Sequence, residues 1–215
     1  MIKLFPIILV LSFIGCTEND IQEFWHEDAI WYQIFPDRFY NGDLSNDPTI
    51  ESLRGTWPYE AQNSWSVMPW NSEWYQFQAW EKENGRDFYY NAQLRRYGGD
   101  IQGILLKLDY LQELGVNAIY LNPIFESPSA HKYGAKYYHH IDNNFGPNPD
   151  YDEKIWENEN PADPTTWQWT TADSLFLKLI DEVHKRNMHI IIDGVFNHVG
   201  IPFWALEDVR KNGKQ

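Results

Sequence analysis

The chain has 215 residues, a formal net charge of −14 and an aromatic content of 17%, with 11 tryptophans. So negative a chain argues against nucleic acid or anionic lipid headgroups as partners, because their phosphates would repel it. Neutral sugars fit better, since their apolar C–H faces lie well against indole and phenol rings. The single cysteine excludes an internal disulfide.

A secretory signal peptide is predicted over residues 1–16. Lys3 supplies the positive start, and residues 4–14 form an apolar run too short to span a bilayer comfortably. The position of Cys16 resembles a bacterial lipoprotein box, so we expect lipid attachment there and a polar tether over residues 17–28. This predicts a place in the bacterial cell envelope, with membrane attachment through the lipid anchor only. The alternative is an ordinary secretory signal with a fortuitous cysteine.

A strand is predicted over residues 29–39, and Pro36 stops it from continuing as part of a ladder. The loop that follows, residues 41–48, is rich in oxygen-bearing side chains and is punctuated by glycine and proline. Calcium favours such hard oxygen ligands, about six to eight of them. The loop is therefore a candidate cation site, although Asn, Asp, Ser and Gly are also ordinary turn formers.

A long aromatic insertion, residues 41–96, separates this strand from the first predicted helix. Its tryptophans are Trp57, Trp65, Trp70, Trp74 and Trp80. Exposure of so many rings would need a purpose such as polysaccharide binding, but partial burial is the commoner outcome for tryptophan. We expect packing rather than binding for any single ring.

Two amphipathic helices are predicted, and each leads directly into an apolar strand. Apolar residues recur with helical spacing between Asp100 and Leu114, and Gly115 is well placed to end this helix. A second helix follows Thr171, with these residues facing inward: Leu175, Phe176, Leu179, Ile180 and Val183. The order strand, helix, strand, helix, strand predicts that residues 29–215 form the N-terminal portion, strands 1–3, of a parallel (β/α)8 barrel.

The third strand ends in the run IIIDGVFNHVG, residues 190–200. Strands of a parallel barrel end at the active-site face, so the polar residues Asp193, Asn197 and His198 indicate chemistry there. Alternation along a strand predicts that Asp193, Val195 and Asn197 share one face. The alternative is that the Asp and Asn side chains only satisfy backbone groups at the strand end, with an ordinary loop histidine after them.

The motif DGVFNH, residues 193–198, resembles the first signature motif of the α-amylase superfamily, glycoside hydrolase family 13. Three further stretches resemble the family in the same order. They are residues 29–39, residues 97–104 and residues 115–124, the last followed by SPSAHKY at residues 127–133, which is similar to neopullulanases and cyclomaltodextrinases. On these four matches the chain is identified as a member of the family.

The resemblance implies a retaining glycoside hydrolase that cleaves α-glucosidic bonds in starch-like glucans, maltooligosaccharides or cyclodextrins. It implies that Tyr133 stacks on the sugar next to the cleaved bond and that His198 donates a hydrogen bond to the same sugar. Asp193 corresponds to a structural aspartate that orients an arginine of the fourth strand, and Asn197 to a residue that supports the loop after strand three. A transglycosylase of the same family and a noncatalytic glycan-binding lipoprotein remain alternatives.

A structural calcium site is also implied by the resemblance. Its ligands would be Asn41, Asp43, Asn46, Asp47, the Gly98 carbonyl and Asp100. The alternative role of Asp100 is to cap the helix that starts after it.

The catalytic carboxylates are not expected within this chain. A complete barrel needs about 250 residues, and in the family the nucleophile, the acid/base and a second aspartate follow strands four, five and seven. We therefore expect an incomplete barrel with two open edges and an exposed apolar face, prone to aggregate when alone.

Three histidines and one polar stretch are not expected to take part in function. The histidines His131, His139 and His140 are interpreted as scattered surface residues without metal-ligand spacing. Residues 157–164 are interpreted as a solvated loop before the second helix.

Overall fold

The structure is a computed structural model that describes residues 25–59 and 64–213. The predicted signal peptide, Cys16 and most of the predicted tether lie outside the described residues. Within the described ranges, no helix combines the length and the hydropathy needed to cross a membrane.

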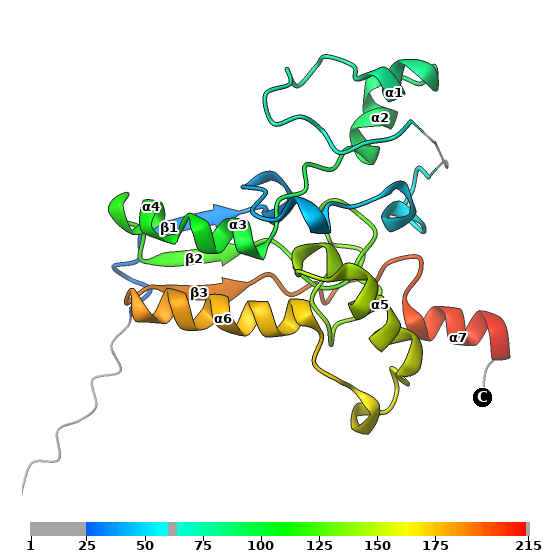
Figure 1. Cartoon of the computed structure of the whole chain (residues 1–215). Coiled ribbons are helices and arrows are strands. Elements are labelled where there is room, and N and C mark those ends of the chain that lie inside the picture. Colours follow the sequence, from blue (N-terminus) through cyan, green and yellow to red (C-terminus); the bar gives the residue numbers. More distant parts are fainter. Residues whose placement is uncertain (1–24, 60–63, 214–215) are drawn as a thin grey trace, which may run out of the picture.

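The described strands form one parallel sheet in the order β1-β2-β3 (Figure 1). Its strands are β1 (Trp31–Ile34), β2 (Ala118–Leu121) and β3 (His189–Ile192). In register, Trp31 lies opposite Ala118, which in turn lies opposite His189. Strand β1 is shorter than predicted, and Pro36 begins a 3-10 turn after it, as its fixed φ favours. The predicted strand order and the partial (β/α)8 barrel are confirmed.

Helices α3 (Ile101–Leu106), α4 (Leu108–Glu113) and α6 (Thr171–Lys185) lie along the sheet (Figure 1). The single helix predicted from Asp100 to Leu114 is therefore wrong. It is broken at Lys107, whose φ of −107° and ψ of 3° are not helical. The Lys107 N–H donates to the carbonyl of Ile104, three residues back instead of the four of an α-helix. The second predicted helix is confirmed, and Thr170 caps its start.

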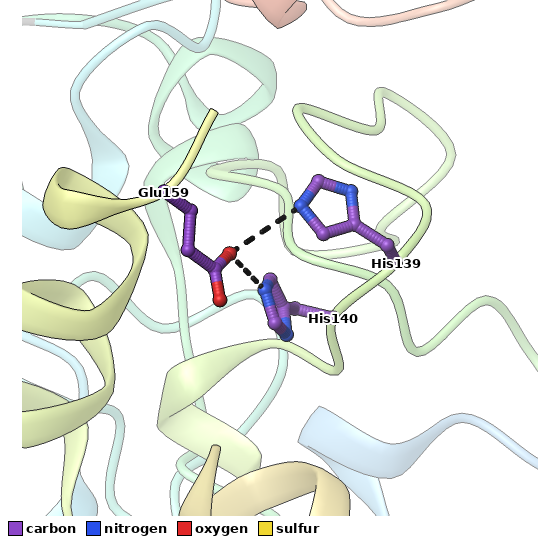
Figure 2. A group of neighbouring side chains, drawn as sticks. All are labelled: His139, His140 and Glu159. Atoms are coloured by element: carbon purple, nitrogen blue, oxygen red, sulfur yellow. Dashed lines mark hydrogen bonds and ion pairs between the residues drawn. The ribbon is translucent and has the colours of Figure 1, made fainter. Parts of the chain in front are cut away.

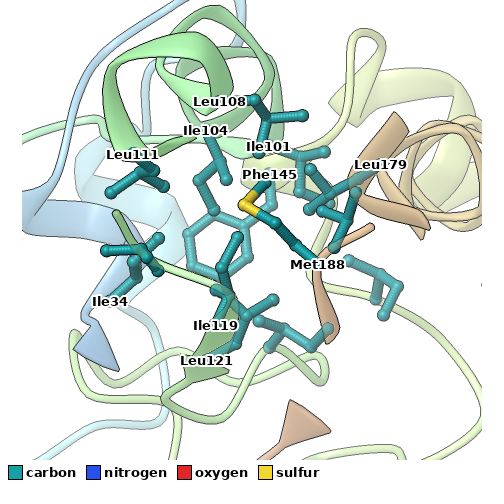
Figure 3. Packing of buried hydrophobic residues seen from close by; sticks show 14 of the residues in the cluster. Ile34, Ile101, Ile104, Leu108, Leu111, Ile119, Leu121, Phe145, Leu179 and Met188 are labelled. Carbon is teal, nitrogen blue, oxygen red and sulfur yellow. The ribbon is translucent and has the colours of Figure 1, made fainter. Parts of the chain in front are cut away.

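The main hydrophobic core lies between these helices and the sheet (Figure 3). Ile104, Leu108 and Leu111 from the helix pair meet Ile119 and Leu121 from β2, and all are fully buried. Burying one such side chain contributes roughly 1.5–3 kcal/mol. The apolar stripe read from the sequence thus marks the correct face, although Leu114, at 54% exposed, lies outside it.

The aromatic insertion has a small core of its own. Fully or nearly fully buried there are Leu53, Met68, Trp80 and Leu94. The elements of the insertion are η2 (Leu44–Asn46), η3 (Ile50–Leu53), α1 (Ala79–Glu83) and α2 (Phe88–Leu94). Packing is confirmed for Trp80, but Trp57 is 79% exposed, so the expectation of burial is wrong for that ring.

The remaining elements connect β2 to α6 or follow β3. They are η4 (Asn143–Phe145), α5 (Pro149–Asn158), η5 (Pro164–Thr166) and α7 (Trp204–Asn212). Helix α5 reaches Asn158, so the predicted solvated loop over residues 157–164 begins within a helix. The buried side chain of Glu159 contradicts that interpretation further.

Candidate active site

Polar side chains gather at the carboxyl ends of the three strands, which the parallel pairing brings to one edge of the sheet. The Gln33 side-chain amide donates to Asn122 Oδ1 at 2.7 Å, which joins the ends of β1 and β2. The Tyr133 hydroxyl donates to Asp193 Oδ2 at 2.6 Å across the end of β3. The structure therefore brings together two of the predicted site residues, Tyr133 and Asp193, which lie 60 positions apart.

The loop that carries Tyr133 is held at several points. The Tyr133 backbone N–H donates to His131 Nδ1 at 3.0 Å, and Ser127 Oγ donates to the Gly134 carbonyl at 2.7 Å. The backbone of Gly200 passes so close that a Cβ there would lie 2.3 Å from the Gly134 carbonyl oxygen. Although glycine is flexible in isolation, Gly134 is fixed by these neighbours.

The hydrogen bond to Asp193 also changes the acidity of the tyrosines at this rim. It raises the pKa of Tyr133 to about 12, with burial acting in the same direction. Hydrogen bonding to Asp193 likewise raises the pKa of Tyr120 on β2. Both shifts have the same cause, since a phenol that donates a hydrogen bond to a carboxylate gives up its proton less readily.

The run after β3 does not continue as a strand. Val195 is buried whereas Asn197 and His198 are exposed, so the prediction that Asp193, Val195 and Asn197 share one face is wrong. The alternation ends because the strand stops at Ile192, and the Tyr138 hydroxyl donates to the Val195 carbonyl at 2.6 Å in place of a ladder partner.

Asn197 and His198 form the outer part of the site. Asn197 Nδ2 lies 3.5 Å from His198 Nδ1, the limiting distance for a hydrogen bond. The imidazole lines an apolar cleft of about 660 Å³ together with Phe125, Tyr138 and Phe196. His198 is thus open to a ligand in this cleft, although it is not joined to Tyr133 by a direct contact in the structure.

The predicted cation loop converges on Asp100 from several directions. The Asp100 carboxylate accepts from the backbone N–H groups of Gly42, at 3.2 Å, and Asp43, at 2.8 Å, and from Asn46 Nδ2 at 3.3 Å. It also accepts from Gly103 N–H at 2.5 Å, which makes it the N-cap of α3. The helix-cap role is therefore confirmed for Asp100.

Other oxygens of this loop have no such donors. Asn41 Oδ1 and Asn46 Oδ1 are buried and lack a hydrogen-bond partner within the described part of the chain. Asp47 accepts from Asn41 Nδ2 at 2.6 Å, and a Cβ on Gly98 would lie 2.2 Å from Asp47 Oδ1, so the Gly98 backbone is adjacent. Burial raises the pKa of Asp47, and the nearby carboxylates of Asp100, Asp37 and Asp43 act in the same direction.

A buried ion pair beneath the Tyr133 loop was not anticipated from the sequence. Lys132 Nζ lies 2.6 Å from Asp142 Oδ2 and also donates to the Ser127 carbonyl at 2.8 Å. Lys132 has a φ of +59°, an uncommon conformation for a side chain of its size. Nothing in the local pattern marks the pair, since a lysine in a loop is normally solvated.

The interpretation of the three histidines needs correction. His131 is exposed and supports the Tyr133 loop, but the His140 side chain is only 2% exposed and lies between two carboxylates. His140 Nδ1 lies 2.8 Å from Asp173 Oδ2, and Nε2 lies 2.7 Å from Glu159 Oε2. The surface assignment is wrong for His139 as well, whose side chain is 7% exposed. These contacts span α5 and α6, so no spacing along the sequence could have found them.

The fold and this rim define the chain as part of a parallel (β/α) barrel, with its candidate site at the carboxyl ends of the strands. A family profile described as "Alpha amylase, catalytic domain" matches residues 33–160. The chain belongs to the alpha-amylase family, which confirms the predicted resemblance.

Two similar proteins agree with this assignment. An amylopullulanase from Thermoanaerobacterium saccharolyticum is 42% identical over 176 residues, 81% of this chain and 11% of the relative. A cyclomaltodextrinase from Thermoanaerobacter pseudethanolicus is 37% identical over 191 residues, 89% of this chain and 23% of the relative. The chain thus spans less than a quarter of the length of either relative.

Solved structures show the same fold. A cyclic α-maltosyl-(1→6)-maltose hydrolase from Arthrobacter globiformis gives a TM-score of 0.56 at 32% identity, covering 87% of this chain and 30% of that one. The type III pullulan hydrolase from Thermococcus kodakarensis gives 0.58 at 34% identity, covering 86% and 26%.

Proposed function

We propose that the protein containing this chain is a retaining glycoside hydrolase that acts on α-glucosidic bonds of starch-like glucans, maltooligosaccharides or cyclodextrins. The observation that carries the proposal is the 2.6 Å bond between the Tyr133 hydroxyl and Asp193 at the carboxyl end of β3, beside the open cleft that His198 lines. The names of the relatives support an oligosaccharide substrate, since the hydrolase from Arthrobacter globiformis has been solved in complex with maltose and in complex with cyclic α-maltosyl-(1→6)-maltose.

Each side chain has a part in this proposal. The Tyr133 ring, fixed at its hydroxyl, offers an apolar face to the sugar beside the cleaved bond, and the His198 imidazole donates to a hydroxyl of that sugar. The Asp193 carboxylate is a hydrogen-bond acceptor at the strand end and orients an arginine of the fourth strand. Asn197 supports the loop after β3. Retaining hydrolysis needs two carboxylates about 5–5.5 Å apart, one as nucleophile and one as acid/base. We expect both of these carboxylates from sequence beyond this chain.

The test is an assay of the protein expressed from its complete gene on starch, pullulan and cyclodextrins, with the anomer of the first product followed by NMR. Hydrolysis with retention supports the proposal. Longer oligosaccharides formed from maltotriose would indicate a transglycosylase instead. Binding of glucan without any product would indicate a noncatalytic glycan-binding protein and would overturn the hydrolase proposal.

We also propose a structural calcium ion at the loop of residues 41–48. The buried, unpartnered Oδ1 atoms of Asn41 and Asn46 fit a hard cation, and Asp47 would supply charge beside them. Asp43, the Gly98 carbonyl and Asp100 complete the proposed set. The Asp43 carboxylate already accepts from Ser45 N–H at 2.9 Å and from Ser45 Oγ at 2.6 Å, so it and Asp100 are the weaker candidates.

Chelation tests the calcium site. EDTA should lower the melting temperature of the protein, and added Ca²⁺ should restore it, because an ion that binds only the folded state stabilises that state. Asp47→Asn should reduce this response, whereas the exposed Asp150→Asn should not. A melting temperature unchanged by chelation would contradict the site.

Lipid attachment at Cys16 completes the proposal for the cell envelope. Cys16→Ala should release the protein from the membrane fraction and abolish labelling by a fatty-acid analogue in bacterial cells. A Cys16→Ala variant that stays in the membrane fraction would contradict the anchor.

A further inference from the structure

Two histidines and a glutamate from different parts of the chain meet in a buried cluster. Figure 2 shows His139 and His140 from the loop before η4 and Glu159 from the end of α5, with all three side chains pointing toward one another. His140 Nε2 lies 2.7 Å and His139 Nε2 lies 3.7 Å from the same carboxylate oxygen, Glu159 Oε2. The side chains of His140, His139 and Glu159 are 2%, 7% and 1% exposed.

We propose that this cluster binds a divalent transition metal ion, with Zn²⁺ as the best fit, through His139 Nε2, His140 Nε2 and Glu159 Oε2. Two imidazole nitrogens and one carboxylate oxygen are ligands that zinc accepts, with one further position left for water. The ligand atoms all lie within 4.8 Å of one another. Zinc bonds of about 2.0–2.2 Å place tetrahedral ligands roughly 3.4 Å apart, so small side-chain shifts suffice.

Each of the three ligands is already held by a neighbour. The Asp173 carboxylate accepts from His140 Nδ1 at 2.8 Å, and this bond directs the lone pair of Nε2 toward the centre of the cluster. The second oxygen of Glu159 accepts from the backbone N–H of Gln168. The His139 ring stacks on Trp167, with ring centroids 4.2 Å apart and planes 14° apart. A metal-binding histidine oriented by a carboxylate is a recurring arrangement in zinc sites.

The short contact inside the cluster also calls for a cation. With His140 Nδ1–H donating to Asp173, both His140 Nε2 and Glu159 Oε2 are acceptors, yet they lie 2.7 Å apart. Either a proton or a metal ion must lie between them. A proton accounts for His140 alone, whereas a metal ion also accounts for the second buried imidazole, that of His139, directed at the same oxygen.

A bound ion would join three segments that are distant in sequence. The ligands come from the loop after β2 and the end of α5, and their support comes from Asp173, in the first turn of α6. Asp173 also accepts from the backbone N–H groups of Ile141 and Thr170, at 2.8 Å and 3.1 Å. A metal ion here would therefore have a structural role, because it would hold these three segments together.

The test uses the protein expressed from its complete gene and stripped of transition metals. Excess Ca²⁺ is kept in the buffer, so that the proposed calcium site stays occupied and does not contribute to the measured Zn²⁺ binding. Zn²⁺ binding is measured by titration calorimetry, and Co²⁺ binding by its visible absorption. His139→Gln removes one ligand, and Glu159→Gln keeps an acceptor for Gln168 while removing the charge. His184→Gln, on the exposed face of α6, is the matched control.

One Zn²⁺ per chain is expected for the wild type and the control, with binding at least about 100-fold weaker in both ligand variants, since even supporting residues are typically worth 10–100-fold. Melting curves of the metal-free proteins show whether each variant folds. The absence of stoichiometric Zn²⁺ binding in the wild type would overturn the proposal, as would unchanged affinity in a folded His139→Gln or Glu159→Gln variant. The result would then favour a proton shared by His140 and its two carboxylates.

Discussion

At the scale of single residues, Tyr133 shows how a loop residue becomes part of a site. Its hydroxyl is bound to Asp193, its backbone N–H to His131, and the next residue is held through Ser127. The ring is thereby fixed before any ligand arrives, which lowers the entropy lost on binding.

Two substitutions separate the ring of Tyr133 from its hydroxyl. Tyr133→Ala should lower kcat/KM on a maltooligosaccharide by at least about tenfold more than Tyr133→Phe, a difference of about 1.4 kcal/mol. Phenylalanine keeps the apolar face for the sugar and loses only the bond to Asp193. Tyr151→Ala, an exposed ring on α5, is the control. Equal losses in the two Tyr133 variants would mean that the ring face is not used.

We predict that Glu126 makes the stability of the protein depend on pH. It is buried, its Oε2 has no hydrogen-bond partner among the described residues, and burial, with Asp142 acting in the same direction, raises its pKa from 4.5 to about 8. The folded state therefore holds this proton more tightly than the unfolded chain. The stability from this proton is fully present below pH 4.5 and is lost as the pH rises through about 8.

A neutral isostere should remove that dependence. We expect Glu126→Gln to raise the melting temperature relative to the wild type at pH 9 and to change it much less at pH 5, as measured by thermal unfolding. The exposed Glu153→Gln variant on α5 serves as the control. A difference from the wild type that is the same at both pH values would show that Glu126 is not the titrating group.

At the scale of elements, the start of α3 is set by a close approach of two backbones. Asp100 caps the helix, and a Cβ on Gly103 would lie 1.8 Å from the Tyr40 carbonyl oxygen. Helix propensity alone favours alanine over glycine by about 1 kcal/mol. Here the contact is with backbone and cannot be relieved by a side-chain rotation, so packing outweighs propensity.

Gly103→Ala should consequently destabilise the protein by about 3 kcal/mol, near the upper end of usual overpacking costs. Denaturant unfolding of the protein from its complete gene would measure the loss. Gln102→Ala, the preceding position in the same helix, should have a small effect. A stabilised Gly103→Ala variant would mean that helix propensity decides at this position.

At the scale of the whole molecule, the described sheet is open. Strand β3 pairs only with β2 among the described strands, and Ile191 and Ile192 are 37% and 38% exposed. Phe196, just beyond the strand, is 95% exposed. An unpaired strand edge beside an apolar face is a template for association.

This chain produced alone should therefore aggregate. Light scattering after size-exclusion chromatography should show large species, and Ile191→Lys, which adds a charge to the apolar face, should increase the monomeric fraction. Lys185→Arg, an exposed conservative change on α6, should leave the profile unchanged. A monodisperse wild-type species of 25.5 kDa would contradict the prediction.

The amino-acid sequence by itself determined the order of the three strands, the barrel class and the family. It named Asp193 and Tyr133 as candidate site residues, but it did not predict the hydrogen bond between them. Helical and strand periodicities follow from local backbone geometry and from which face is buried, so they can be read along the chain. The motif at the end of the third strand predicted the position of the candidate site, because the carboxyl ends of parallel strands meet at one edge of the sheet.

Only the tertiary structure decided which polar groups are buried together. His140 meets Asp173 and Glu159 from separations of 33 and 19 residues, and Lys132 meets Asp142 across a folded loop. Such contacts depend on the paths of loops and on the packing of α5 against α6, which no short pattern of residue types encodes. The structure likewise decided that the alternation of side chains along β3 ends at Ile192. The chain leaves the sheet there, and the Val195 carbonyl accepts a hydrogen bond from the Tyr138 hydroxyl instead of from a neighbouring strand.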